Sequence, residues 1–224
     1  MTTTTTTMPK PHGDRPITGM MAKWYTSNTS EMMKEYVNLA RRVANQLPQG
    51  SFVLEVAPGP GYFAIELAKL GSYQITGLDL SDAMVKIAQT KAAEAGIRAE
   101  FKQGSASKMP LQTASYDFLL CRAAFKNFAQ PVEALREMCR VLRPGGRGLI
   151  IDMKRESTPK ELNAAVDEMG LSAVNRILTK LAFRTVLLRS AYTRAQIEAM
   201  LAQAKFRRFE IAESGIGLEI TMIK

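Results

Sequence analysis

Histidine, cysteine and tryptophan are scarce in this chain of 224 residues, which contains one histidine, two cysteines and one tryptophan. The histidine, His12, lies in a proline-rich stretch near the amino terminus, which disfavours a mechanism that uses histidine as the acid or base. Cys121 and Cys139 lack the spacing of a metal site or a disulfide framework. We therefore expect no metal centre and a reducing, cytoplasmic environment.

Long apolar runs are also absent. No run approaches the roughly 18 residues that a membrane-spanning helix needs, and the amino terminus has no apolar signal core. The composition, 46% hydrophobic and 23% charged, is typical of a globular protein. These features predict a soluble protein with no membrane span, preceded by a tail over residues 1–19 that is rich in threonine and proline.

The charge is unbalanced toward the basic side, with a formal net charge of +9. Such a charge attracts nucleic acid, an anionic membrane surface or an acidic small molecule. The basic residues are scattered, however, and the tightest groups, Arg41-Arg42 and 205–208, are too short for a nucleic-acid-binding arm. We interpret most of the charge as a solvated basic surface.

Helical and strand-like patterns alternate along the chain. Strands are predicted over 51–57, 73–78, 99–103, 116–121 and 147–152, and helices over 31–47, 61–70, 81–95 and 131–142. We expect Pro144, Gly145 and Gly146 to stop the last of these helices. The alternation predicts a parallel sheet covered on both faces, with a ligand site beyond the carboxyl ends of its strands.

The first predicted strand leads into an unusual loop, VLEVAPGPGYF, over residues 53–63. Glycines allow a ligand to approach the backbone closely, and the two prolines stiffen the loop and are expected to hold Ala57 and Gly59 extended. The Gly59-x-Gly61-x-x-Ala64 spacing would fit a dinucleotide. Glu55 would repel a pyrophosphate, though, so the loop favours a cofactor with an amino group and a cationic centre.

Several segments together resemble the class I S-adenosylmethionine-dependent methyltransferases. They are VLEVAPGPGYFAIELAKLG, ITGLDLSDAMVKIAQTKA, AEFKQGSASKMPL, YDFLLCRAAFKNF and ALREMCRVLRPGGRGLII. The resemblance implies an α/β fold with a doubly wound, mostly parallel sheet of seven strands in the order 3-2-1-4-5-7-6, the last strand antiparallel. It also implies one domain over 20–224, with an amino-terminal cap over 20–48 and a helical insert or lid over 159–203.

The resemblance also assigns roles in binding S-adenosylmethionine. Its binding residues would be Glu55, Ala57, Gly59, Gly61, Asp79, Leu80, Met84, Ser105, Ala106, Cys121 and Arg122. Glu55 would meet the amino group, Asp79 the ribose hydroxyls, and the backbone of 121–122 the methionine portion. The adenine would be contacted by Leu80, Met84, Ser105 and Ala106. Met84 and Cys121 are equally explained as core residues.

Three departures from the family pattern limit these assignments. Ala57 replaces a glycine, Ser105 replaces an aspartate that often binds the adenine, and Lys126 replaces a frequent histidine. The remaining candidates for a catalytic group are Tyr25, Lys126 and Asp152. Tyr25 lies in the segment that folds over the cofactor in related proteins.

The insert combines apolar and basic residues at helical spacing. The apolar positions are Leu171, Val174, Ile177, Leu178 and Leu181. We expect an amphipathic helix packed on the sheet, or alternatively a wall of the substrate pocket. Arg176, Lys180 and Arg184 repeat every four residues, and Asp167 and Glu168 are candidates to compensate their charge. We predict that at least one of the three faces the pocket and that the acceptor is anionic or carries an acidic group.

The resemblance therefore implies methyl transfer by in-line displacement from S-adenosylmethionine to a small-molecule acceptor, which leaves S-adenosylhomocysteine. Two alternatives stay open. The first is a nucleic-acid methyltransferase, disfavoured because CRAAFKNF lacks the Asn/Asp-Pro-Pro-aromatic motif that holds a flipped base. The second is a non-catalytic protein that binds S-adenosylmethionine. The acceptor atom and the oligomeric state are not specified by the residues.

Overall fold

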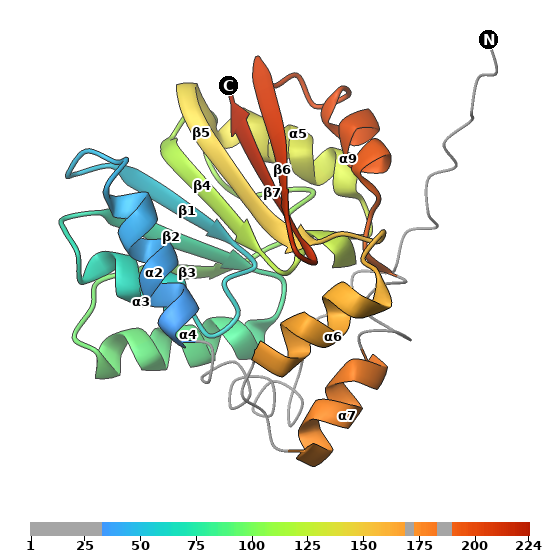
Figure 1. Cartoon of the computed structure of the whole chain (residues 1–224). Coiled ribbons are helices and arrows are strands. Elements are labelled where there is room, and N and C mark those ends of the chain that lie inside the picture. The colour runs from blue at the N-terminus through green and yellow to red at the C-terminus, as the bar shows by residue number, and fades with distance from the viewer. Residues whose placement is uncertain (1–32, 169–172, 183–189) are drawn as a thin grey trace, which may run out of the picture.

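A seven-stranded sheet forms the centre of the protein (Figure 1). The computed structural model describes residues 33–168, 173–182 and 190–224. The strands lie in the order β3-β2-β1-β4-β5-β7-β6. Strand β7 runs antiparallel to both of its neighbours, and the other pairings are parallel. The predicted fold class and strand order are confirmed.

The strands follow the predicted alternation closely. They are β1 (Phe52–Val56), β2 (Gln74–Asp79), β3 (Glu100–Gln103), β4 (Tyr116–Arg122), β5 (Leu142–Met153), β6 (Arg208–Ser214) and β7 (Gly217–Ile223). Side chains of consecutive strand residues point to opposite faces, so β1 and β4 supply two cores. Val53 and Leu120 are buried in one core, and Leu54 and Leu119 in the other.

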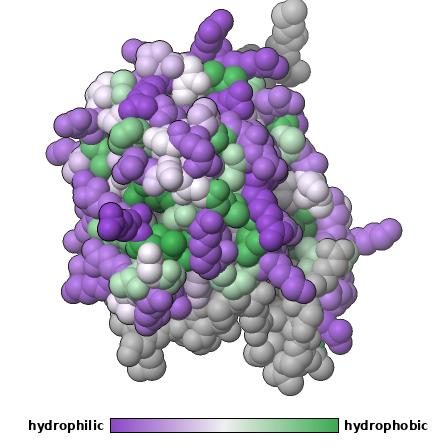
Figure 2. All heavy atoms as spheres, turned by 90° about the vertical axis from the view of Figure 1, so that its left-hand side faces the viewer, coloured by the Kyte–Doolittle hydropathy of each residue, from purple (hydrophilic) through white to green (hydrophobic). Residues whose placement is uncertain are grey.

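Each face of the sheet is covered by its own helices (Figure 1). Helices α2 (Met33–Ala44), α3 (Tyr62–Ala68) and α4 (Asp82–Glu94) contribute to the core that contains Val53. Helices α5 (Pro131–Val141) and α9 (Arg194–Leu201) contribute to the core that contains Leu54. On the surface shown in Figure 2, hydrophilic side chains predominate between small groups of apolar ones, as expected for a solvated exterior.

Local sequence signals explain both ends of α4. Ser81 caps α4, because its side chain accepts a hydrogen bond from the backbone N–H of Met84 at 3.2 Å. Gly96, at φ 67°, follows the end of that helix as predicted. The predicted end of the next helix holds to within one residue, but the strand predicted to begin at 147 begins earlier. Helix α5 ends at Val141, and β5 begins at Leu142 and runs through the Pro-Gly-Gly sequence. Backbone pairing of Tyr116 with Leu142 draws this segment into the sheet.

The segment between β5 and β6 contains α6 (Pro159–Glu168), α7 (Ala173–Ala182) and α9. Helices α6 and α7 lie on the side of the sheet where the parallel strands end (Figure 1). The expected packing of the apolar row of α7 is wrong for Ile177 and Leu181, which are 67% and 57% exposed. Helix α7 packs against α6. Arg176 and Lys180 both pair with Asp167 of α6, at 3.8 and 2.7 Å, and Arg184 lies outside the described residues.

A close contact between strands β2 and β3 holds the loop after β1 against the sheet. A Cβ atom placed on Gly77 would lie 2.5 Å from Cδ1 of Phe101 and 3.1 Å from Cγ of Pro58. A Cβ atom on Gly61 would lie 3.0 Å from Cζ of the same Phe101 ring. The ring therefore packs against two glycines, one in β2 and one in the loop, and both positions require a residue without a side chain.

Gly77→Ala tests this packing. We expect the added methyl group to displace the Phe101 ring and to lower the free energy of unfolding by about 1–3 kcal/mol, measured by urea denaturation. In a Phe101→Leu background the same change should cost less, because the two positions are in contact. Equal costs in both backgrounds would show that the ring is not what restricts position 77.

Candidate functional site

The carboxyl ends of the parallel strands bring the predicted site residues to one edge of the sheet. Glu55 and Asp79 stand near the ends of β1 and β2, and Arg122 ends β4. Backbone hydrogen bonds join these ends, from Ala57 N–H to the carbonyl of Leu78 at 2.8 Å and from Gly104 N–H to the carbonyl of Asp79 at 2.8 Å. The edge is thus a continuous surface built from strands that are distant in sequence.

The loop after β1 has three residues in the left-handed region. Ala57, Gly59 and Gly61 have φ values of 55°, 54° and 77°. The prediction that Ala57 and Gly59 are extended is therefore wrong. A following proline disfavours the right-handed helical region but does not impose an extended conformation. Here two hydrogen bonds bend the chain, one from Ala57 N–H to β2 and one from Gly61 N–H to the Pro58 carbonyl at 3.0 Å. Ala57 holds this conformation at a steric cost that a glycine avoids.

Asp79 organises the loop from the neighbouring strand. One carboxylate oxygen accepts from Gly59 N–H at 3.1 Å, and the other accepts from Ser81 N–H at 2.9 Å. Burial raises the pKa of Asp79, and these two backbone donors lower it. Each carboxylate oxygen has a second lone pair, so the group can accept further hydrogen bonds from hydroxyl groups of a ligand.

Glu55 is a buried carboxyl group beside the same loop. Its residue is 3% exposed, and Oε2 accepts from Ala64 N–H in the first turn of α3 at 3.2 Å. Burial raises the pKa of Glu55 to about 8, although the Ala64 N–H and the nearby Arg122 charge oppose the rise. A cation brought against Glu55 would favour the ionised carboxylate, so the position suits a ligand with an ammonium group.

The residues predicted to meet the adenine lie in the segments that follow β2 and β3. Met84 is buried in the first turn of α4, and the Leu80 carbonyl accepts from Gln103 Nε2 at 3.3 Å. Ser105 Oγ lies 2.9 Å from Ser107 Oγ. Ala106 is partly buried against the core that contains Leu54. Ser105 therefore orders its own turn with a hydroxyl, where the family often has a carboxylate, and these adenine roles stay predictions.

Cys121 and Arg122 point to opposite faces at the end of β4. The Cys121 side chain is fully buried, and burial raises the pKa of its thiol well above the usual value. It is a core residue, and its predicted backbone role stays a prediction. The Arg122 side chain forms an ion pair with Glu35 of α2 and lies over the ring of Tyr36, 4.5 Å from its centroid. No local pattern in the sequence indicates this side-chain role or either partner.

Two of the catalytic candidates form a buried ion pair. Lys126, in the short helix η2 (Phe125–Asn127), places Nζ 2.8 Å from Oδ1 of Asp152 near the end of β5. The two carboxylate oxygens also accept from the N–H groups of Met153 at 2.8 Å and Lys126 at 2.9 Å. Three donors hold this carboxylate, so Asp152 is a poor choice for a free base. Tyr25 lies outside the described residues.

Tyr192 was not foreseen at this end of the sheet. Its ring lies 5.7 Å from that of Phe125, and a bridge joins its backbone to Lys154 just after β5. Burial raises the pKa of the Tyr192 phenol, and the charge of Asp152 raises it further. Only the long-range return of the chain before α9 brings Tyr192 here, and no local signal marked it.

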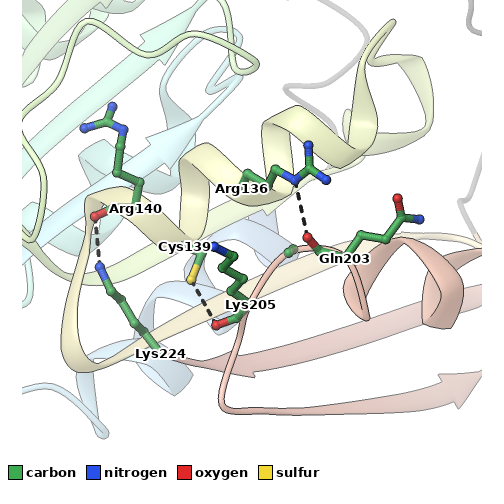
Figure 3. Close-up of a pocket in the computed structure, with 7 residues that line it drawn as sticks. Arg136, Cys139, Arg140, Gln203, Lys205 and Lys224 are labelled. Atoms are coloured by element: carbon green, nitrogen blue, oxygen red, sulfur yellow. Dashed lines mark hydrogen bonds between the residues drawn. The ribbon is translucent and has the colours of Figure 1, made fainter.

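An open pocket of about 550 Å³ lies at the opposite, amino end of the strands (Figure 3). It is lined by Arg136, Cys139, Arg140, Gln203, Ala204, Lys205 and Lys224. Most of its cations already have acceptors. Arg136 and Arg140 pair with Glu133 and Glu137 of the same helix, and Lys224 donates to the carbonyls of Arg140 and Leu142. These contacts tie the end of the sheet to α5, so the pocket has a structural explanation.

Two absences hold for the described residues, 33–168, 173–182 and 190–224. No group of three or more histidine, cysteine, aspartate or glutamate side chains there could hold a metal ion. No helix in those ranges is both long and apolar enough to cross a membrane.

Comparisons with known proteins agree with this geometry. Residues 54–150 match the model of a family described as a methyltransferase domain. The demethylmenaquinone methyltransferase of Deinococcus radiodurans is 40% identical over 101 residues, 45% of this chain and 42% of that protein. That of Chlorobaculum parvum is 31% identical over 164 residues, 70% of this chain and 66% of that protein. The chain spans about half the length of most curated relatives that it matches.

Solved structures share this fold. A putative S-adenosylmethionine-dependent methyltransferase from Methanococcus maripaludis superposes with a TM-score of 0.77 at 21% identity, over 95% of this chain and 96% of that one. A methyltransferase from Aquifex aeolicus gives 0.64 at 21% identity, over 82% and 88%. At these identities the likeness establishes the fold.

The buried carboxyl of Glu55 predicts a specific pH dependence of stability. Without ligand, the folded protein keeps a proton on Glu55 up to about pH 8, whereas the unfolded chain releases it near 4.5. This stabilisation is full below the unfolded value and is lost as the pH rises through about 8. Glu55→Gln should therefore be the more stable protein at high pH, by roughly 3–5 kcal/mol at most.

Urea denaturation from pH 5 to 9 measures the difference between the two proteins. The exposed Glu100, which pairs with Lys102 at 3.0 Å, supplies the control: Glu100→Gln should leave the pH profile nearly parallel to that of the wild type. A Glu55→Gln profile that also runs parallel to the wild type would contradict the buried, protonated carboxyl.

Proposed function

The chain belongs to the class I S-adenosylmethionine-dependent methyltransferases, and from this premise we propose that it transfers a methyl group from S-adenosylmethionine to a small-molecule acceptor. The observation that carries the proposal is that the carboxyl groups of Glu55 and Asp79 both lie beside the loop after β1, whose backbone has left-handed residues. A ligand with an ammonium group and a ribose diol satisfies both carboxylates.

The site residues fit this cofactor on physical grounds. The buried Glu55 gains a counter-ion from the ammonium group, which offsets the cost of ionising it. Asp79 has lone pairs for two hydroxyl groups, and Gly59 and Gly61 let the ligand lie against the backbone. When bound, S-adenosylmethionine supplies a methyl group already activated by the sulfonium centre.

Because the methyl group is activated by its carrier, the protein has to align the acceptor in line with it and exclude water. Lys126 lies in η2, which follows β4, and pairs with Asp152 near the end of β5, whose charge acts on Tyr192. Both charges are held by each other and by backbone groups. We propose that this pair shapes the acceptor side of the site, and that an acceptor which must lose a proton is ionised before it binds or uses a group outside the pair.

The relatives guide the choice of acceptor. Those named here act, by their names, on demethylmenaquinone, and another is a ubiquinone biosynthesis O-methyltransferase. We therefore propose hydroxylated or quinone-type rings as the first acceptors to test. The prediction of an anionic acceptor is compatible with a phenolate or with a ring that carries a carboxylate.

Cofactor binding is tested with Asp79→Ala. Loss of a carboxylate that accepts two ribose hydroxyls should weaken S-adenosylmethionine binding by about 1.5–3 kcal/mol in titration calorimetry. Asp117→Ala is the matched control, because Asp117 also accepts a backbone N–H, from Phe52 at 2.8 Å, but at the opposite end of the sheet. Similar losses of affinity in both variants would indicate general destabilisation instead of a ribose contact.

Turnover is tested by screening acceptors for formation of S-adenosylhomocysteine. We expect conversion with a hydroxylated aromatic or quinone-type acceptor, and its loss in Asp79→Ala at cofactor concentrations near the wild-type Kd. The panel should include thiols, amines, carboxylates and RNA. Turnover only with RNA would overturn the small-molecule acceptor, and tight cofactor binding without turnover of any class would favour the non-catalytic alternative.

A further inference from the structure

Arg122 lies on the same face of the sheet as Glu55, one pleat farther along the neighbouring strand. Glu55 of β1 is in register with Leu120 of β4, and side chains two residues apart on a strand point the same way. Burial raises the pKa of Glu55, and the Arg122 guanidinium lies near enough to oppose that rise. The edge therefore presents one acidic and one basic group side by side on one face.

The guanidinium is held in place by α2. Arg122 pairs with Glu35 and stacks over the Tyr36 ring at 4.5 Å, so one helix supplies both contacts. The Arg122 side chain is 14% exposed, whereas that of Glu35 is 59% exposed. An ion pair with a largely hydrated carboxylate contributes little free energy, while the aromatic contact keeps the guanidinium plane oriented. The acidic partner can be exchanged without moving the guanidinium far.

Other cations near this edge are held by more acceptors or by a more buried one. Lys126 is buried against Asp152 and also donates to the Ala123 carbonyl at 2.8 Å. Lys154 pairs with two carboxylates, those of Glu161 and Glu213, at 3.4 and 3.2 Å. Of these three cations, Arg122 is the one whose carboxylate partner is mostly exposed to water.

We infer that Arg122 binds the carboxylate of the amino-acid end of S-adenosylmethionine while Glu55 binds its ammonium group, and that Glu35 holds Arg122 when no cofactor is bound. The inference rests on the proposed function and goes beyond it, because it assigns a side chain to the carboxylate and links α2 to cofactor binding. An amino-acid end carries both charges on one carbon atom, which matches the adjacent charges of the edge. The planar guanidinium also offers a carboxylate two parallel donors.

The exchange of partners has a second consequence. Glu35 competes with the cofactor for one guanidinium, so the contact of α2 with the edge and the binding of the cofactor oppose each other. Glu35→Gln removes the competing charge, and it should tighten S-adenosylmethionine binding by roughly two- to fivefold. Arg122→Gln removes the carboxylate-binding group and should weaken it by roughly 10- to 100-fold.

Decarboxylated S-adenosylmethionine provides the decisive comparison in titration calorimetry. The wild type should bind it roughly 10- to 100-fold more weakly than S-adenosylmethionine. In Arg122→Gln the two ligands should bind within about threefold of each other, because the group that distinguishes them is gone. Arg122→Lys keeps the charge without the planar fork, so it should show intermediate discrimination and serves as the second variant if Arg122→Gln folds poorly.

Arg143 supplies a matched control. It also pairs with an acid, Asp117 at 2.6 Å, and lies over an aromatic ring, Phe52 at 4.7 Å, but at the amino end of the strands. Arg143→Gln should keep the wild-type preference for S-adenosylmethionine over the decarboxylated form. A loss of discrimination in both variants would show that the effect follows from destabilisation.

The outcomes separate this inference from the proposed function. A wild type that binds no S-adenosylmethionine would overturn both. A wild type that binds it, together with Arg122→Gln or Arg122→Lys variants that keep full discrimination, would overturn the role of Arg122 alone. If Arg122→Gln loses discrimination while Glu35→Gln binds S-adenosylmethionine with wild-type affinity, the carboxylate contact is supported and the competition by Glu35 of α2 is overturned.

Discussion

The buried carboxyl group of Glu55 is the constraint around which the rest of the site is arranged. A carboxyl group inside the protein is costly to ionise, and burial accordingly raises the pKa of Glu55 to about 8. The position is tolerated because Ala64 N–H, at the start of α3, donates to it. Its neighbour Arg122 brings a positive charge from β4. The helix, the loop and two strands thus meet at one ionisable group that favours a cationic ligand.

The loop after β1 is set by contacts from β2 and β3. Asp79 and the Leu78 carbonyl bind its N–H groups from β2, and the Phe101 ring of β3 packs against Gly61. All of these contacts are made within the protein, so little of the free energy of cofactor binding has to be spent on ordering the loop. Ala57, in a left-handed conformation, shows that this arrangement is imposed by the surrounding structure.

Basic side chains at both edges of the sheet are paired with acidic ones. Arg122, Lys126 and Lys154 at the carboxyl edge each have an acidic partner, and so do Arg136 and Arg140 at the amino edge. What distinguishes these pairs is burial: Lys126–Asp152 is enclosed, whereas Glu35 is open to water. We therefore propose that the buried Lys126–Asp152 pair shapes the acceptor side of the site, and that Arg122 exchanges Glu35 for the carboxylate of the cofactor.

The sequence by itself determined the alternation of strands and helices and the acidic residues at the strand ends, and the strand order was implied by the family resemblance of its motifs. Alternating patterns, Gly96 and the Ser81 cap are local signals, and parallel strands necessarily place Glu55 and Asp79 at one edge. It also marked Arg122, Lys126 and Asp152 as residues of that edge.

Only the tertiary structure decided what those side chains contact. Arg122 meets Glu35 across 87 residues of sequence, and Lys126 meets Asp152 across 26, so no local pattern reveals either pair. The left-handed Ala57 and the exposed Ile177 and Leu181 likewise depend on neighbours that the local sequence does not name. Propensity and periodicity describe a residue and its near neighbours, whereas the partner of a charge is set by how distant segments pack.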